Sequence, residues 1–335
     1  MLPIVAVTLR VPSAFATTRI LLVIQDDFCN DATPTPTNLP LARVLQQGET
    51  AMSEHPAYGR VLLTFARNSL IRDMTFRTNF LLECVSSVSW TLMNVGFYLI
   101  VFSHAPYIGP DSGWGKYEFF VFLGTTWLIN SLVQAFCMPN ADEFSELIRT
   151  GNLDFALLKP IDTQFLISFQ RVEWSSLVNV VTALVLLGIS LWQLTTRPDN
   201  PLVLDWIVLL LYPIYVLMGA AILYSLTISL AATSIWLGRN QSLYDFWFYI
   251  TNFARYPMEI YRRGWGVPLW GFFTFVVPVL VVVNVPARLL AQPLHPRAWW
   301  EWPLAGFALL ATVLSLLGSR WVFNRALLSY RSASS

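Results

Sequence analysis

Asp142-Glu-Phe-Ser-Glu-Leu-Ile-Arg-Thr-Gly-Asn-Leu-Asp-Phe-Ala-Leu-Leu-Lys-Pro-Ile-Asp162 is a charged segment between two apolar runs, residues 117–138 and 165–191. About 20 consecutive apolar residues are enough to cross the roughly 30 Å hydrocarbon core of a bilayer. Both runs reach that length, so the charged segment lies at a membrane surface. We interpret it as a candidate docking surface, and an ordinary loop between two spans is the alternative.

The composition of the whole chain indicates an integral membrane protein. Hydrophobic residues make up 55% of the 335 residues, charged residues only 12%, and the mean hydropathy is +0.54. The formal net charge of +1 suggests neither nucleic acid nor an acidic partner. The three cysteines lack metal-ligand spacing, so we expect no metal site on this chain.

Hydropathy predicts an all-α fold with six transmembrane helices. We expect them at about residues 80–102, 117–138, 165–191, 202–237, 243–256 and 304–323. The fourth run is longer than one perpendicular helix needs and contains Pro213. Tilt, a kink or an interfacial first turn must absorb the excess length.

The segment 243–291 allows two interpretations. In one, residues 243–256 are a slightly short fifth span and 265–291 form a re-entrant hairpin; in the other, 243–256 lie at the interface and 265–291 are the fifth span. Pro268, Pro278 and Pro286 would break a continuous helix repeatedly. Backbone groups freed at membrane depth are tolerated only where protein or a cavity covers them, so we favour the hairpin.

The chain ends differ from the membrane region, 58–330. Residues 1–57 include an apolar stretch, 1–24, which Arg10 and Arg19 interrupt, and a stretch of linker composition, 31–40. They are expected to be a disordered extension, or translated upstream sequence with the true start at Met52 rather than Met1. Residues 59–76 have the apolar spacing of an amphipathic helix at a membrane surface. Residues 331–335 are expected to be a short tail.

The distribution of Lys and Arg predicts that both termini are cytoplasmic. Eleven of these residues lie on the faces assigned to the cytoplasm and seven on the opposite face. Five of the seven fall between Arg255 and Arg297, which is a cost of the hairpin interpretation. Near the inner surface, we expect Arg171 to pair with a carboxylate, and interfacial snorkelling is the alternative.

Within the charged segment, residues 142–150 predict a short helix lying on the membrane surface. One face is apolar, the other is polar, and Gly151 stands where the residue after a helix belongs. Residues 153–158 then carry the chain back to the bilayer, and Pro160 ends the segment. The apolar face consists of Phe144, Leu147 and Ile148, and the polar face of Glu143, Glu146 and Arg149.

Residues 148–162 resemble the signature of the ABC type-2 exporter permeases, in the branch with the pattern R-x-G-x-L-D-x-x-L-L-(R/K)-P. The pattern is carried here by Arg149, Gly151, Leu153, Asp154, Leu157, Leu158, Lys159 and Pro160, with lysine where arginine is more usual. A second resemblance is the pair Tyr256-Pro257 with the later Pro278 and Pro286. In that family an aromatic-proline pair ends the fifth span and a re-entrant hairpin precedes the sixth.

This resemblance implies a permease subunit of an ATP-driven export system in the inner (plasma) membrane. Residues 58–330 would be the permease domain, 59–76 its elbow helix and 142–150 the coupling helix that docks on an ATPase. The implied partners are ABC ATPase subunits, a second permease copy or paralogue, membrane lipid and an unidentified exported substrate. ATP and Mg²⁺ would be bound by the ATPase. Tyr256, Pro257, Pro278 and Pro286 would belong to an outer gate. The residues implied for coupling are Glu143, Phe144, Glu146, Leu147, Ile148, Arg149, Gly151, Leu153, Asp154, Leu158, Lys159 and Pro160.

The sequence contains no complete nucleotide-binding motif. Gly113-Trp-Gly-Lys116 has the final Gly-Lys of a phosphate-binding loop but lacks its first glycine and its hydroxyl residue. The three histidines lie far apart, and no carboxylate pair falls in mid-membrane, so we expect no enzyme active site. The alternative function is an ATP-independent secondary transporter or channel, which would need mid-membrane ionisable groups or inverted repeats that we do not find.

Overall fold

The computed structural model describes residues 57–108, 113–198, 201–237, 248–292 and 301–330. The expected extension, apart from Ala57, and the expected tail at 331–335 lie outside these ranges. Every regular element in the described ranges is a helix, which confirms the all-α prediction for this part of the chain.

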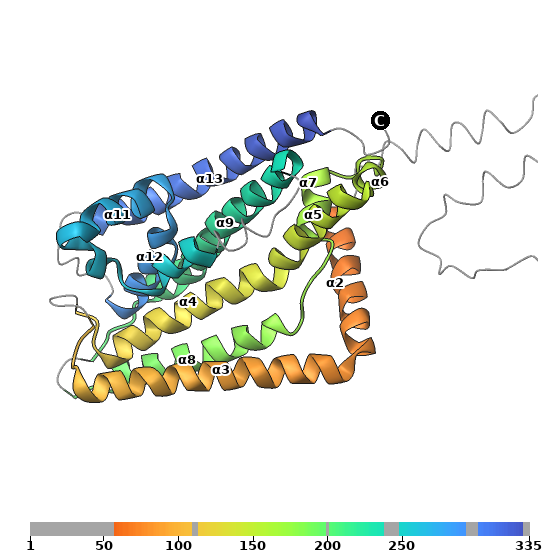
Figure 1. Cartoon of the computed structure of the whole chain (residues 1–335). Coiled ribbons are helices and arrows are strands. Elements are labelled where there is room, and N and C mark those ends of the chain that lie inside the picture. The colour runs from red at the N-terminus through yellow and green to blue at the C-terminus, as the bar shows by residue number, and fades with distance from the viewer. Residues whose placement is uncertain (1–56, 109–112, 199–200, 238–247, 293–300, 331–335) are drawn as a thin grey trace, which may run out of the picture. The chain divides into compact units, whose positions relative to one another are not determined.

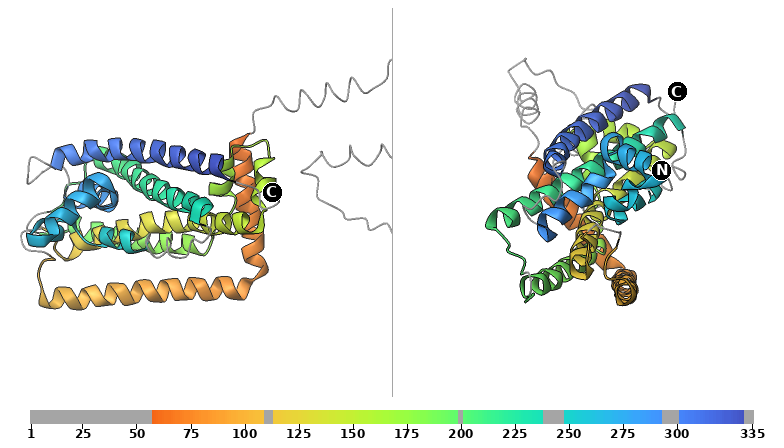
Figure 2. Two further views of the ribbon diagram at one scale, coloured as in Figure 1. Left: turned by 45° about the horizontal axis from the view of Figure 1, so that its top comes forward. Right: turned by 90° about the vertical axis from the view of Figure 1, so that its left-hand side faces the viewer.

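Five long helices run side by side (Figures 1 and 2). Each is long and apolar enough to cross a membrane, and a bent helix pair over residues 264–291 would make a sixth. The expected spans at 80–102, 117–138, 202–237 and 304–323 each coincide with one of these helices to within a few residues. The five are α3 (Arg77–His104), α4 (Lys116–Phe136), α8 (Ser176–Thr195), α9 (Trp206–Leu237) and α13 (Glu301–Ser329).

The third span begins later than expected. Instead of one helix from residue 165, the chain forms the short α7 (Thr163–Phe169), a non-helical stretch over 170–175, and then α8. The prediction was wrong because side chains distant in sequence bind the backbone of this stretch. Asn140 accepts a hydrogen bond from Arg171 N at 2.8 Å and donates one to Arg171 O at 2.7 Å.

Helix α2 (Tyr58–Thr75) completes the support of that stretch. Ser69 Oγ accepts a hydrogen bond from Val172 N at 3.1 Å, and Asp73 Oδ2 accepts one from Trp174 N at 3.2 Å. Backbone groups that a continuous helix would have paired internally are therefore paired with α2 and with the segment after α4. Figure 1 shows α2 running across the end of the bundle, at a steep angle to α3.

The bundle has two ends, which we name by what lies there. The α6 end carries α5 (Met138–Thr150), α6 (Leu153–Leu157) and α7, and the opposite end, which carries α11 (Val267–Gly271) and the start of α4, is called the hairpin end (Figure 1). Helix α9 finishes at the α6 end, whereas Glu259 contacts Trp114 just before α4 begins. The chain therefore passes from one end to the other between Leu237 and Glu259. The fifth span was expected within this interval, and residues 238–247 lie outside the described ranges.

A bent helix pair occupies the hairpin end. Helix α11 (Val267–Gly271) and the π-helical turn that follows it lead to Pro278, where the chain turns by 86° into α12 (Val279–Ala291). Proline cannot donate the backbone bond that would continue the helix, which accounts for a break there. The pair is thus either a broken span or a re-entrant element. Of the three prolines predicted to break the helix, only Pro278 stands at the bend, because Pro268 lies in the first turn of α11 and Pro286 lies inside the continuous α12.

Buried apolar side chains form two clusters. The larger lies between α4, α8, α9 and α12 and includes Phe122, Leu187 and Leu223. The smaller lies at the α6 end, where Phe144 and Leu153 pack with residues of α7, α9 and α13. The signature segment is therefore anchored in a core of its own.

Candidate functional site

Helix α5 continues α4 rather than lying separately on the membrane surface. The two together span Lys116–Thr150, 35 residues, with a single irregular residue at Cys137. Cys137 remains in the right-handed helical region, and its N–H still bonds Val133 O at 2.8 Å. Pro139 sits in the first turn of α5, where a missing N–H costs nothing. The prediction of a separate helix starting at residue 142 was therefore wrong in its start and its direction.

The apolar face predicted for docking is covered by the chain itself. Phe144 is fully buried and its ring lies 5.8 Å from that of Phe323 in α13. Leu147 and Ile148 are half-buried against the same cluster. On the polar face, Glu143 is half-buried, while Glu146 and Arg149 are exposed.

Two signature residues have clear local structural roles. Arg149 forms an ion pair with Glu146 at 2.6 Å along the exposed side of α5. Gly151 has φ 74° and ends α5, as predicted, because this left-handed conformation favours glycine. Leu153 is fully buried at the start of α6, and Asp154 lies in the first turn of that helix.

The outward side of α6 exposes three apolar residues that we call the α6 patch. Phe155 is 69% exposed, Leu157 40% and Leu158 81%, while Leu153 and Ala156 on the other side enter the core. Lys159 and Pro160 are exposed directly after the patch. Phe155 and Leu157 were absent from the predicted coupling residues, because the signature gives no indication of which of its apolar residues face outward.

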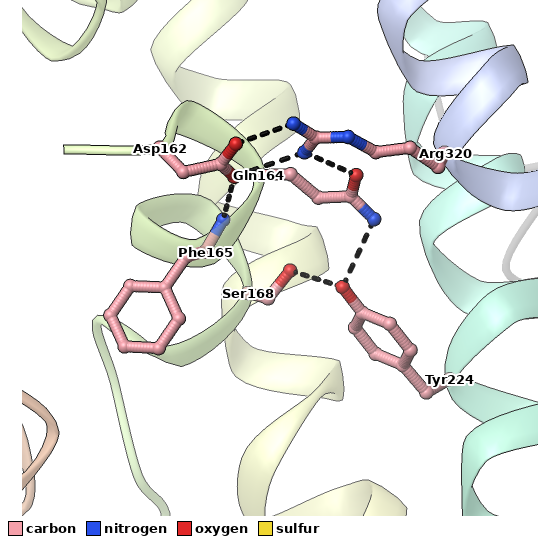
Figure 3. A network of polar contacts seen from close by, with 6 residues as sticks. All are labelled: Asp162, Gln164, Phe165, Ser168, Tyr224 and Arg320. Atoms are coloured by element: carbon pink, nitrogen blue, oxygen red, sulfur yellow. Dashed lines mark hydrogen bonds and ion pairs between the residues drawn. The ribbon is translucent and has the colours of Figure 1, made fainter. Parts of the chain in front are cut away.

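A polar network joins the end of the signature segment to two long helices (Figure 3). Asp162 caps α7 by accepting a hydrogen bond from Phe165 N at 2.9 Å. Both of its carboxylate oxygens also accept hydrogen bonds from Arg320 of α13, at 3.0 and 2.5 Å. Arg320 Nη1 donates to Gln164 Oε1 at 2.9 Å as well. Asp162 and Arg320 are 158 positions apart, so no local sequence pattern could predict this contact.

The network continues from α7 into α9. Gln164 Nε2 donates to the Tyr224 hydroxyl at 3.2 Å, and Ser168 Oγ lies 2.8 Å from the same hydroxyl. Gln164 and Ser168 are buried, so their polar atoms depend on these partners. The hydrogen bonds from the Arg320 guanidinium lower the pKa of the Asp162 carboxyl, while partial burial opposes that effect. Asp162 is therefore ionised at neutral pH.

An open hollow of about 680 Å³ lies beside α5. Its charged lining consists of one arginine, Arg171, and four carboxylates, Asp142, Glu143, Glu146 and Glu173. The predicted pairing of Arg171 is not observed: no ion pair joins its guanidinium to a carboxylate of the described residues. It is the backbone of Arg171, held by Asn140, that fixes this stretch.

The proline positions predicted for an outer gate lie along the path of the hairpin. Tyr256 is exposed at the end of a 3₁₀ turn, and Pro257 is buried next to it. Pro278 precedes α12 at the bend, and Pro286 is buried inside α12. These residues thus lie along one bent element, with Tyr256 and Pro257 before it, Pro278 at its bend and Pro286 in its second helix.

The hairpin is held at its own end of the bundle by a buried ion pair. Arg288 donates a hydrogen bond to Glu259, and both side chains are largely buried, 15% and 13% exposed. Trp114 Nε1 donates to the other carboxylate oxygen of Glu259 at 3.0 Å. Arg262 lies over the Trp270 ring at 5.2 Å. Two of the five cations that counted against the hairpin interpretation therefore have partners within this region.

A comparison with protein families matches residues 88–334, well over half of the chain, to a model described as ABC-2 family transporter protein. The match begins inside α3 and includes the signature segment, the hairpin and α13. No curated protein and no solved structure matches the chain.

Proposed function

The chain belongs to the ABC-2 family of transporter proteins, and on that premise we propose that it is the permease subunit of an ATP-driven export system. In this proposal the chain provides the membrane pathway, and separate ABC ATPase subunits bind ATP and Mg²⁺. A second permease copy or a paralogue completes the pathway. The complex lies in the inner (plasma) membrane with both termini of this chain in the cytoplasm, so the α6 end is the cytoplasmic end.

The observation that carries the proposal is the exposed α6 patch. Apolar exposure on the sides of the spans is expected, because those surfaces face lipid. The patch instead lies on α6, at the end of the bundle (Figure 1), and the charged residues Asp154 and Lys159 flank it in the sequence. A contiguous apolar surface rimmed by polar residues is typical of a protein interaction site. We assign this surface to the ATPase.

The rest of the α6 end supplies a polar rim to the same interface. The Glu146–Arg149 pair lies on the exposed side of α5, and the acidic hollow lies beside it. Exposed charges of this kind contribute more to partner choice and association rate than to affinity. The apolar patch would therefore provide most of the binding energy, and the rim would select the partner.

The connection between docking and the pathway is supported by the continuity of α4 and α5. Helix α5 leads from α4 without a loop, and α6 is anchored by Leu153 and Ala156 in the small core. A rigid element moved at one end transmits the movement to the helix attached to it. In this proposal α5 and α6 act together as the coupling element, and α2 is the elbow helix.

We further assign residues 264–291 to a re-entrant hairpin at the outer end. Its two approaches lie at the same end of the bundle, since Glu259 before it pairs with Arg288 near its finish. Its turn lies deeper, because the backbone of Val282 contacts Gly219 near the middle of α9. An element that enters and leaves at one end does not cross the membrane.

Co-purification tests the proposal. The wild-type chain, isolated from its native membrane, is expected to bring an ABC ATPase with it, identified by mass spectrometry and by ATP hydrolysis. The double variant Phe155→Asp/Leu158→Asp should lose at least about tenfold of that ATPase, while Thr150→Asp, an exposed control in the same segment, should retain it. Transport without any co-purifying ATPase would favour the secondary transporter and would contradict the proposal.

A further inference from the structure

We propose that Arg320 is a positioning residue for α6 and α7, which we together call the docking segment. Arg320 holds this segment to α9 and α13, so that displacement of the segment moves the long helices through this contact. The inference rests on the proposed function in one respect, namely that an ATPase causes the displacement. The attachment itself is a property of this chain alone.

The chain joins the docking segment to the rest of the bundle only at the two ends of the segment. Gly151 gives it a turn at the start, and the non-helical stretch 170–175 follows it. Between these points, α6 and α7 are held by packing and by polar contacts, which include the network of Figure 3 and a contact between Asp154 and Tyr330, just after α13. The way in which they move the bundle therefore depends on those two kinds of contact.

The apolar contacts resist separation but do little to define direction. Leu153, Ala156 and Leu166 lie in one cluster with Phe323 and Ala326 of α13 and with residues of α9. Apolar attraction is non-directional, so small side chains such as these alanines permit sliding along the contact. Packing alone would let the segment shift without carrying α13 with it.

The Arg320 contact defines direction. Its planar guanidinium engages both oxygens of Asp162, and such a two-point contact fixes relative orientation as well as distance. The same guanidinium holds Gln164, which in turn holds Tyr224 of α9. One side chain of α13 is therefore linked through α7 to α9, as Figure 3 shows.

The Asp162–Arg320 pair is partly exposed, so its positioning role can be tested separately from any stabilising role. The Arg320 side chain is 46% exposed and that of Asp162 is 33% exposed. Water screens an ion pair of this kind, so its loss changes the stability of the fold little. Removal of the pair should therefore impair coupling in a protein that still folds.

Hydrogen exchange on the full chain in lipid nanodiscs tests the attachment. In Arg320→Met, amides of residues 158–169 should exchange at least about fivefold faster than in the wild-type chain. Arg325→Met is the matched control, because Arg325 is exposed on the same helix one and a half turns further on. Equal exchange in this segment for both variants would overturn the proposal.

The two roles of Asp162 are separated by a second pair of variants. Asn is a good helix cap, so Asp162→Asn keeps the bond to Phe165 N but removes the charge, whereas Asp162→Ala removes both. The proposal predicts that Asp162→Asn behaves like Arg320→Met and that combining the two changes adds nothing further. Wild-type exchange in Asp162→Asn would mean that capping alone matters and would overturn the proposal.

The purified complex tests transmission. Arg320→Met should retain the ATPase in wild-type amount, while the ATP hydrolysis rate of the complex falls at least about fivefold; Arg320→Lys should fall between the two. Loss of the ATPase from Arg320→Met would make Arg320 a docking residue and would overturn the proposal. If the wild-type chain carries no ATPase, the proposed function fails, and hydrogen exchange alone decides whether Arg320 holds the segment.

Discussion

Gly219 of α9 lies against the carbonyl oxygen of Val282 in α12, so closely that a Cβ added to the glycine would stand 2.7 Å from that oxygen. Pro286, one turn further along α12, has no N–H to donate to this carbonyl. The absence of a side chain at Gly219 thus permits the hairpin to reach the middle of the bundle, with the carbonyl that receives no bond from Pro286 lying against α9.

Gly219→Ala should therefore destabilise the hairpin contact. A Cβ this close to backbone forces a shift, and overpacking typically costs about 1–3 kcal/mol in the free energy of unfolding. Thermal unfolding in detergent, followed by tryptophan fluorescence, measures the effect. Gly188→Ala in α8 is the control, because no heavy atom lies within 4 Å of its added Cβ. Equal unfolding temperatures for the two variants would contradict the close packing described above.

Glu259→Gln should lower the free energy of unfolding more than an equivalent change in a second ion pair at the hairpin end. It leaves Arg288 largely buried without its counter-charge, which costs about 3–5 kcal/mol in fully buried pairs. The matched control is Glu118→Gln, because its partner Arg197 is 38% exposed. This variant should lose only about 0–1 kcal/mol in the free energy of unfolding. Thermal unfolding compares them, and similar losses would show that Arg288 is as well hydrated as Arg197.

Asn140→Leu should loosen the stretch before α8. The substitution removes both hydrogen bonds to the backbone of Arg171, and a hydrogen bond of this kind typically contributes about 0.5–1.5 kcal/mol. Hydrogen exchange over residues 170–175 should rise. Asn94→Leu is the control, since Asn94 bonds only one turn back in its own helix, to Trp90 O. If the two variants leave this stretch equally protected, Asn140 does not cause the break between α7 and α8.

The Asp162–Arg320 contact should be insensitive to pH across the physiological range. Because the pKa of Asp162 is lowered in the folded chain, its contribution is present above the unfolded pKa, about 3.9, and is lost as pH falls through the lower folded value. The difference in unfolding temperature between the wild-type chain and Asp162→Asn should therefore stay constant from pH 5 to pH 8. A difference that titrates within that window would assign the effect to another group.

Much of the membrane fold was predictable because long apolar runs need no tertiary information. The expected spans at 80–102 and 304–323 agree with α3 and α13 to within a few residues, apart from extra turns at their ends. The third span was misplaced because side chains of α2 and α5 interrupt it. A local apolar pattern does not reveal hydrogen bonds from residues more than 30 positions away, such as that from Asn140 to Arg171.

The docking role of the signature segment stays a prediction, but the side of the segment that is exposed differs from the side predicted from its sequence. Phe144 and Phe155 are both aromatic residues in polar surroundings, and hydropathy treats them alike. The ring of Phe323 lies against Phe144, whereas Phe155 remains exposed. Only the packing of α13 decides which of them a partner can reach, so the predicted docking face and the observed exposed patch differ.

Site-specific photo-crosslinking from the α6 patch tests whether this surface docks an ABC ATPase. A photoreactive amino acid at Leu158, the most exposed residue of the patch, should crosslink to an ABC ATPase in native membranes. The same probe at Phe144 should crosslink within the chain, because that position faces α13. Crosslinks from Leu158 to lipid alone, with no ATPase captured, would contradict the account.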